Sequence, residues 1–74
     1  MTTENVKLEN GNAYCDVNES TTAVLALWNL EELDAEFVKL QIVTAFSICE
    51  NFDRIEKHLK INGIDASYIE TQTI

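Results

Sequence analysis

Apolar residues occupy every second position on both sides of an Asn10-Gly11 pair: Val6, Leu8, Ala13, Cys15 and Val17. An Asn-Gly pair is typical of a two-residue type I′ turn, because both central residues of that turn need a positive φ. The pattern predicts a β-hairpin over about residues 4–17, with Val6 opposite Cys15, Leu8 opposite Ala13 and Glu4 opposite Val17. Since an isolated hairpin is marginal in water, its apolar face must pack on the rest of the chain.

The next segment is a short apolar run that ends in Trp28. Before it, residues 18–22 offer several side chains that can cap the first turn of a helix. We therefore expect a short buried helix over about residues 19–29. Trp28 should be packed, with a hydrogen-bond partner for its indole N–H.

Apolar residues then recur at helical spacing from Leu30 to Leu59, and Asn62-Gly63 is typical of a helix C-terminus. The spacing predicts helical structure over about residues 31–61, either as one helix or as two helices joined near residue 50. Asn29 with Glu32 resembles a capping box, and Asp34 is an alternative cap. Along the last turns, acids precede bases by four residues and predict a solvated face: Glu50–Arg54, Asp53–Lys57 and Glu56–Lys60.

Residues 67–73 are rich in β-forming side chains and favour a short C-terminal strand, although Asp65 could instead cap a short helix. The order of elements indicates an α+β fold, in which an N-terminal β-hairpin packs on two or three helices beside this strand. At 74 residues the chain allows one domain over 1–74.

A domain of this size has a marginal core, which self-association would help. The predicted 31–61 segment carries two neighbouring apolar stripes and so has more apolar surface than one small core requires. We therefore expect a homodimer whose self-interface uses this excess: Phe37, Val38, Ile42, Ala45, Phe46, Cys49 and Phe52.

Thirteen acidic and five basic side chains give a formal net charge of −8. This charge repels nucleic acids and anionic membranes and favours the basic surface of another protein. Several acids lack basic partners at good spacing, and they are the candidate partner-binding residues: Asp16, Glu19, Glu31, Glu32, Asp34 and Glu36. The alternative is that these acids only cap helices and keep the chain soluble.

No catalytic, metal-binding or phosphate-binding motif is recognisable, so we expect no enzyme activity, no cofactor and no metal. His58 has no nucleophile or carboxylate placed to form a triad, and Cys15 and Cys49 are typical of reduced, mostly buried thiols. The longest apolar stretch is too short to span a membrane and the first residues lack the order of a secretory signal. The expected location is the cytoplasm.

In size and charge the chain is similar to the small acidic inhibitor proteins that bacteriophages make against host nucleic-acid enzymes, some of which present carboxylates where phosphates bind. This similarity implies a non-enzymatic interaction protein that docks on a basic, nucleic-acid-binding surface. Two alternatives stay open. One is a structural or assembly subunit that uses its apolar helix face, and the other is a regulatory domain that binds a small molecule.

Overall fold

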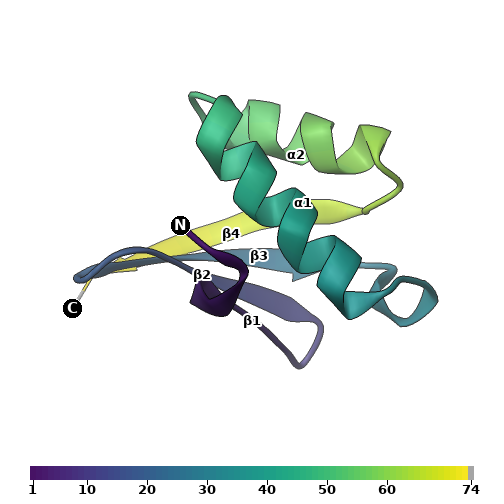
Figure 1. Ribbon diagram of the computed structural model, residues 1–74, viewed down its shortest axis with the longest axis horizontal. Coiled ribbons are helices and arrows are strands. Elements are labelled where there is room, and N and C mark those ends of the chain that lie inside the picture. Colours follow the sequence, from purple (N-terminus) through teal and green to yellow (C-terminus); the bar gives the residue numbers. More distant parts are fainter. Residues whose placement is uncertain (74) are drawn as a thin grey trace.

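A computed structural model describes residues 1–73 as a four-stranded antiparallel sheet, in the order β1-β2-β3-β4, with two helices on one of its faces (Figure 1). The α+β prediction, with its N-terminal hairpin and C-terminal strand, is confirmed. In chain order the elements are η1 (Thr3–Asn5), β1 (Val6–Glu9), β2 (Asn12–Asn18), β3 (Thr21–Leu27), η2 (Leu30–Glu32), α1 (Ala35–Ile48), α2 (Phe52–Ile61) and β4 (Ala66–Thr73), where η marks a short 3-10 turn.

The hairpin of β1 and β2 has the predicted register, with Val6 opposite Cys15 and Leu8 opposite Ala13. Asn10 and Gly11 both have positive φ, at 51° and 77°, as a type I′ turn requires. The outer end differs from the prediction. Glu4 lies in η1 rather than in a strand, and Val17 is 44% exposed, next to an irregularity in the β2–β3 pairing.

The predicted helix over residues 19–29 is wrong, because this segment forms the central strand β3. Residues 18–20 form a turn in which the Asn18 side chain accepts from the Ser20 backbone N–H at 2.9 Å, so this polar cluster reverses the chain instead of capping a helix. Residues 23–27 are all buried. A short apolar run buried on both faces has no strand alternation, which is why its pattern resembled a buried helix.

Strand β4 confirms the C-terminal strand predicted over 67–73 and starts one residue earlier, at Ala66. It pairs antiparallel with β3 and not with the hairpin, so it is one edge of the sheet. Asp65 does not cap a helix. It lies just before β4, where its backbone carbonyl accepts from the Trp28 N–H at 2.7 Å.

The 31–61 segment forms two helices, which agrees with a break near residue 50. Asp34 caps α1 by accepting from the Glu36 N–H at 3.0 Å, whereas Asn29 makes no side-chain cap. Asn51 caps α2 in the same way, through the Arg54 N–H, and Gly63 with φ 81° follows its end. Neither helix is long and apolar enough to cross a membrane.

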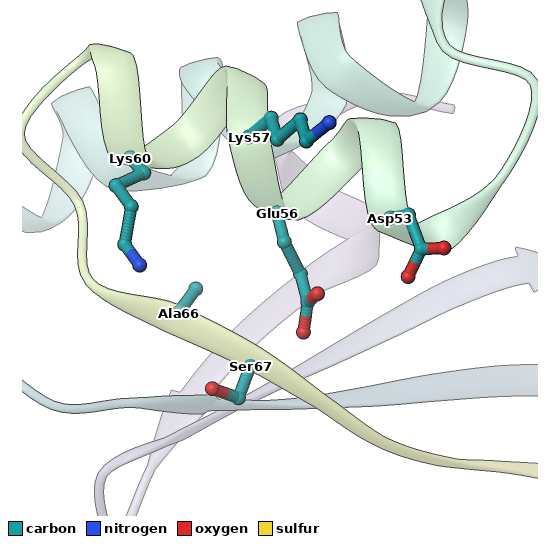
Figure 2. A pocket seen from close by; sticks show the side chains of 6 residues that line it. All are labelled: Asp53, Glu56, Lys57, Lys60, Ala66 and Ser67. Atoms are coloured by element: carbon teal, nitrogen blue, oxygen red, sulfur yellow. The ribbon is translucent and has the colours of Figure 1, made fainter.

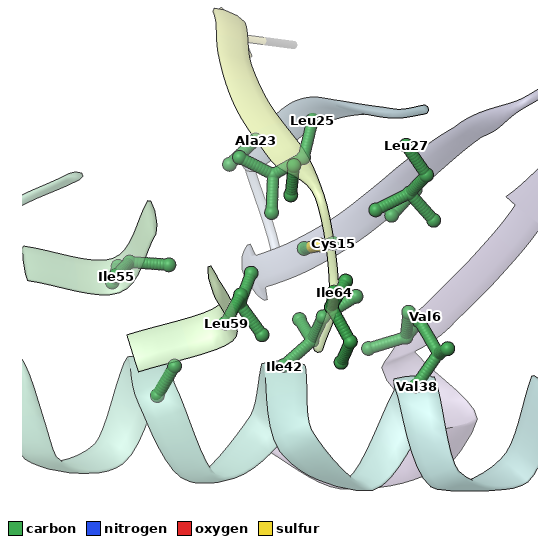
Figure 3. Packing of buried hydrophobic residues seen from close by; sticks show 13 residues of the cluster. Val6, Cys15, Ala23, Leu25, Leu27, Val38, Ile42, Ile55, Leu59 and Ile64 are labelled. Carbon is green, nitrogen blue, oxygen red and sulfur yellow. The ribbon is translucent and has the colours of Figure 1, made fainter. Parts of the chain in front are cut away.

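The hydrophobic core lies between the sheet and the helices (Figure 3). From the predicted self-interface, Val38, Ile42 and Ala45 are fully buried inside this core, so for these three residues the prediction of an intermolecular contact is wrong. Phe46, Cys49 and Phe52 are partly buried against the same core, and Phe37 is exposed. The apparent excess of apolar surface arose because both helices, and not one face of a single helix, cover the sheet.

Alanine substitutions of two residues of equal size on α2, one buried and one exposed, test this core. Leu59 is fully buried, so Leu59→Ala should lower the free energy of unfolding by about 2–5 kcal/mol. Ile61, which is 85% exposed on the same helix, is the matched control, and Ile61→Ala should change it by less than about 0.5 kcal/mol. Urea denaturation followed by circular dichroism measures both values. Equal effects from the two substitutions would contradict the packing described here.

Candidate functional site

The six acids predicted to bind a partner lie at opposite ends of the sheet. Asp16 lies in β2 and Glu19 in the β2–β3 turn, at one end. At the other end Glu31, Glu32 and Asp34 belong to the β3–α1 connection, and Glu36 lies in the first turn of α1. Strand β3 separates the two groups by roughly 20 Å, at about 3.3 Å per residue. The structure therefore does not bring the six together, and only the larger group forms one continuous acidic segment.

This larger group is exposed because its apolar neighbours point inward. Leu30 and Leu33, on either side of Glu31 and Glu32, pack against the core. A short 3-10 turn with its ends held in this way leaves both glutamates in solvent. The Asp34 carboxylate then caps α1, which places negative charge at the positive end of the helix.

Trp28 lies beside these acids and is 69% exposed, which corrects the prediction that it is packed. The predicted partner for the indole N–H is present, because Nε1 donates to Ser67 Oγ at 3.2 Å. With its backbone N–H bonded to Asp65, Trp28 is held at both its main chain and its ring. Trp28, Glu31 and Glu32 also line one shallow depression of about 240 Å³.

Asn29 fixes the loop that carries this surface. Its side-chain Nδ2 donates to the Gly63 carbonyl at 2.9 Å, and its Oδ1 accepts from the Asp65 N–H at 2.9 Å. One amide therefore joins the β3–α1 connection to the α2–β4 connection, 34 to 36 residues away in sequence. Both hydrogen-bonding groups of a single side chain are used, so the loop is set by specific geometry.

Trp28, Glu31 and Glu32 line one depression, and Asp34 and Glu36 follow along the chain; we call these five residues the tryptophan–acid surface. Among residues 1–73 the one ion pair joins Glu36 to Lys39 at 3.9 Å, and the Glu36 side chain is 77% exposed, so this contact is weak. The other acids of this surface form no ion pair within these residues. Sequence reasoning found the acids but missed Trp28 and Asn29, whose positions depend on contacts with residues 63–67.

The groups with reactive chemistry are dispersed. Burial, with a smaller contribution from the Asp16 charge, raises the pKa of the Cys15 thiol to about 12, so this thiol stays protonated and is not a nucleophile. His58 Nε2 lies 3.4 Å from Gln41 Oε1, and although His58 and Cys49 line one hollow, no hydrogen bond joins their side chains within residues 1–73. Within the described part of the chain, no three His, Cys, Asp or Glu side chains are grouped to hold a metal ion.

A second hollow, of about 300 Å³, opens under the α1–α2 turn. It contains the partly buried residues of the predicted self-interface, Phe46, Cys49 and Phe52, together with Val17 and Thr71 from the sheet. Phe52 stacks on Tyr68 with ring centroids 3.9 Å apart, and Phe46 meets Phe52 edge-on at 6.0 Å. These three aromatic side chains close the core at this end.

The raised pKa of Cys15 makes stability depend on pH. Unfolding releases the thiol to its ordinary pKa of about 9, so above pH 9 the unfolded chain loses a proton that the folded chain keeps. The free energy of unfolding should therefore fall as pH rises from about 9 towards 12, by up to about 1.4 kcal/mol per pH unit from this group. Urea midpoints across this range, compared with Cys15→Ala, measure the effect. Equal slopes for both proteins would contradict it.

Comparison with known protein families, with curated protein sequences and with solved structures found no match. Function is therefore inferred from the geometry of the chain itself. Its strongest local feature is the tryptophan–acid surface, where a fixed aromatic ring and several free carboxylates are exposed together.

Proposed function

We propose that this protein is a non-enzymatic protein–protein interaction module that docks on a basic surface of a partner through the tryptophan–acid surface. The observation that carries the proposal is Trp28, which is 69% exposed although its ring N–H is anchored to Ser67. An exposed tryptophan that is already ordered loses little conformational entropy on binding. Tryptophan is also among the residues that most often dominate binding energy.

The surrounding charge indicates which partner fits. An arginine can lie over the Trp28 ring while its guanidinium faces the carboxylates of Glu31 or Glu32, which combines cation–π attraction with charge-assisted hydrogen bonds. The net charge of −8 steers a basic surface towards the protein and repels nucleic acid. If that surface normally binds nucleic acid, the docked protein acts as an inhibitor. The two unpaired cysteines fit a reducing compartment such as the cytoplasm.

A second candidate function is an assembly subunit that docks through the outer face of its helices. The supporting observation is the exposure of Leu40, Ile48 and Ile61, at 52%, 65% and 85%. Val38 and Ile42 cannot take part, since both are fully buried in the core. Substitution of Leu40 and Ile48 by Glu should abolish partner binding under this hypothesis and leave it intact under the first.

The first step of the test identifies the partner by contact at the proposed surface. A photoreactive benzoylphenylalanine replaces Trp28 in one sample and the exposed Lys7 of β1 in a control sample. Both proteins are irradiated in extract from the source cells. A protein that crosslinks from position 28 and not from position 7 is then purified for binding measurements.

The second step measures association of the purified partner with charge-reversed variants. Glu31→Lys combined with Glu32→Lys should slow association at low salt by about tenfold or more, because these charges steer the encounter. Asp16→Lys combined with Glu19→Lys is the matched control at the far end of the sheet and should have a smaller effect. Equal effects at both ends would overturn the assignment to this surface.

A further inference from the structure

Strand β4 leaves one long edge of the sheet unpaired. It extends over eight residues, from Ala66 to Thr73, and pairs only with β3 on its inner side. Its sequence contains no proline and one charged residue, Glu70. Exposed edges of this kind readily pair with another strand, and natural proteins protect them when pairing is harmful.

A carboxylate occupies part of this edge. The Tyr68 backbone N–H donates to Glu56 Oε1 of α2 at 2.7 Å. Figure 2 shows the Glu56 side chain pointing down from α2 to β4, between Asp53 and Lys60. Tyr68 lies opposite Leu25, just before the register of the β3–β4 pairing shifts by one residue at Ile69. Up to this bulge the strand alternates regularly, so the Tyr68 carbonyl belongs to the same outer side as its N–H. The Glu56 oxygen thus lies where the carbonyl of a further strand would accept.

The side of α2 beside this edge has a self-complementary charge pattern. Asp53, Glu56, Lys57 and Lys60 all line the groove between α2 and β4, and their i, i+3, i+4, i+7 spacing places them along one side of the helix. The two acids come first and the two bases last. Rotation by 180° about a point between Glu56 and Lys57 places each acid opposite a base. Within residues 1–73 none of the four forms an ion pair, so the expected pairs along this helix are absent.

We propose that β4 pairs antiparallel with β4 of a second copy of this chain, about a twofold axis at Tyr68. The Tyr68 residues of the two copies then exchange both N–H···O=C bonds. Glu56 leaves the Tyr68 N–H and faces Lys57 of the second copy, while Asp53 faces Lys60 of the second copy. One twofold axis can serve both elements, because the hydrogen bond from the Tyr68 N–H to Glu56 places this part of α2 beside Tyr68.

Standard dimensions allow this arrangement. Contacts of α1 with β1 and of α2 with β4 show that the two helices divide the four strands between them. With strands about 4.8 Å apart and helices about 10 Å apart, α2 is set back about 2 Å from the β4 axis. The two α2 helices of the dimer then lie roughly 9 Å apart, which is an ordinary helix-packing distance. The result is an eight-stranded sheet with four helices on one face, in which the bulge at Ile69 confines regular strand pairing across the axis to the residues next to Tyr68.

The occupant is a second copy because the charge pattern matches itself. An unrelated partner strand needs no such symmetry in α2. This dimer also leaves the tryptophan–acid surface free, because that surface lies on the β3–α1 connection. The inference is therefore independent of the proposed function, and either can fail alone.

The test is a charge-swap experiment read by light scattering over a range of protein concentrations, at about 0.15 M salt. Asp53→Lys combined with Glu56→Lys changes the net charge from −8 to −4, since each substitution adds two charges. Weaker overall repulsion favours association, yet we expect the dimer dissociation constant to rise by about tenfold or more, because every facing pair becomes repulsive. Lys57→Glu combined with Lys60→Glu should have the same effect. An equal mixture of the two variants should restore dimers.

Arg54→Glu is the matched control, because Arg54 lies on α2 outside the β4 groove and should leave the dimer unchanged. Hydrogen exchange at the Tyr68 amide gives a second readout and should slow with rising concentration of the native chain. Three results would overturn the proposal: a wild-type monomer at all concentrations, a dimer that both double variants retain, or a mixture that stays monomeric. A dimer lost on Leu40→Glu but not on charge reversal would place the interface on α1 instead.

Discussion

The structure depends on strand β3, which pairs along its whole length with β2 on one edge and with β4 on the other. Residues 23–27 are buried on both faces, so neither edge can open without exposing apolar surface. The two helices must then cross over the sheet to return the chain to the outer side of β3, where β4 pairs. This connection places residues 28–29 and 63–67 side by side, and their hydrogen bonds hold Trp28 in its exposed position.

Local features of the fold could be predicted from the sequence, and non-local ones could not. Asn10-Gly11 determines the hairpin register because a two-residue turn leaves little freedom in the pairing of the strands it joins. For β3 no such signal exists. Val24 is 3% exposed although it faces away from Ala23 and Leu25, and directly opposite it on the same face lie Tyr14 and Glu70. Side chains of both neighbouring strands therefore bury Val24, and the sequence of β3 alone does not predict this burial.

The candidate site could likewise be predicted only where it depends on local features of the sequence. The acids of the β3–α1 connection stand out in composition, and Asp34 was identifiable as an alternative helix cap. The exposure of Trp28 was not, because a tryptophan at the end of an apolar run is normally packed. Its exposure follows from strand parity. Trp28 continues the alternation of β3 on the same face as Val24 and Ala26, which are not part of the core cluster, and lies beside Ser67.

The net charge gives the β4 edge and the tryptophan–acid surface opposite expected responses to salt. Two copies that each carry a net charge of −8 repel one another. This repulsion acts over longer distances than the attraction of the four ion pairs proposed between the two α2 helices. At about 0.01 M salt the screening length is about 30 Å and this repulsion acts across the whole dimer, whereas at about 0.15 M it falls to about 8 Å and mainly the close pairs remain. Moderate salt should therefore favour the proposed association through β4. It should have the opposite effect on the proposed basic partner at the tryptophan–acid surface, because there the long-range force would be attractive. The same net negative charge therefore opposes self-association at long range and favours the approach of a basic partner.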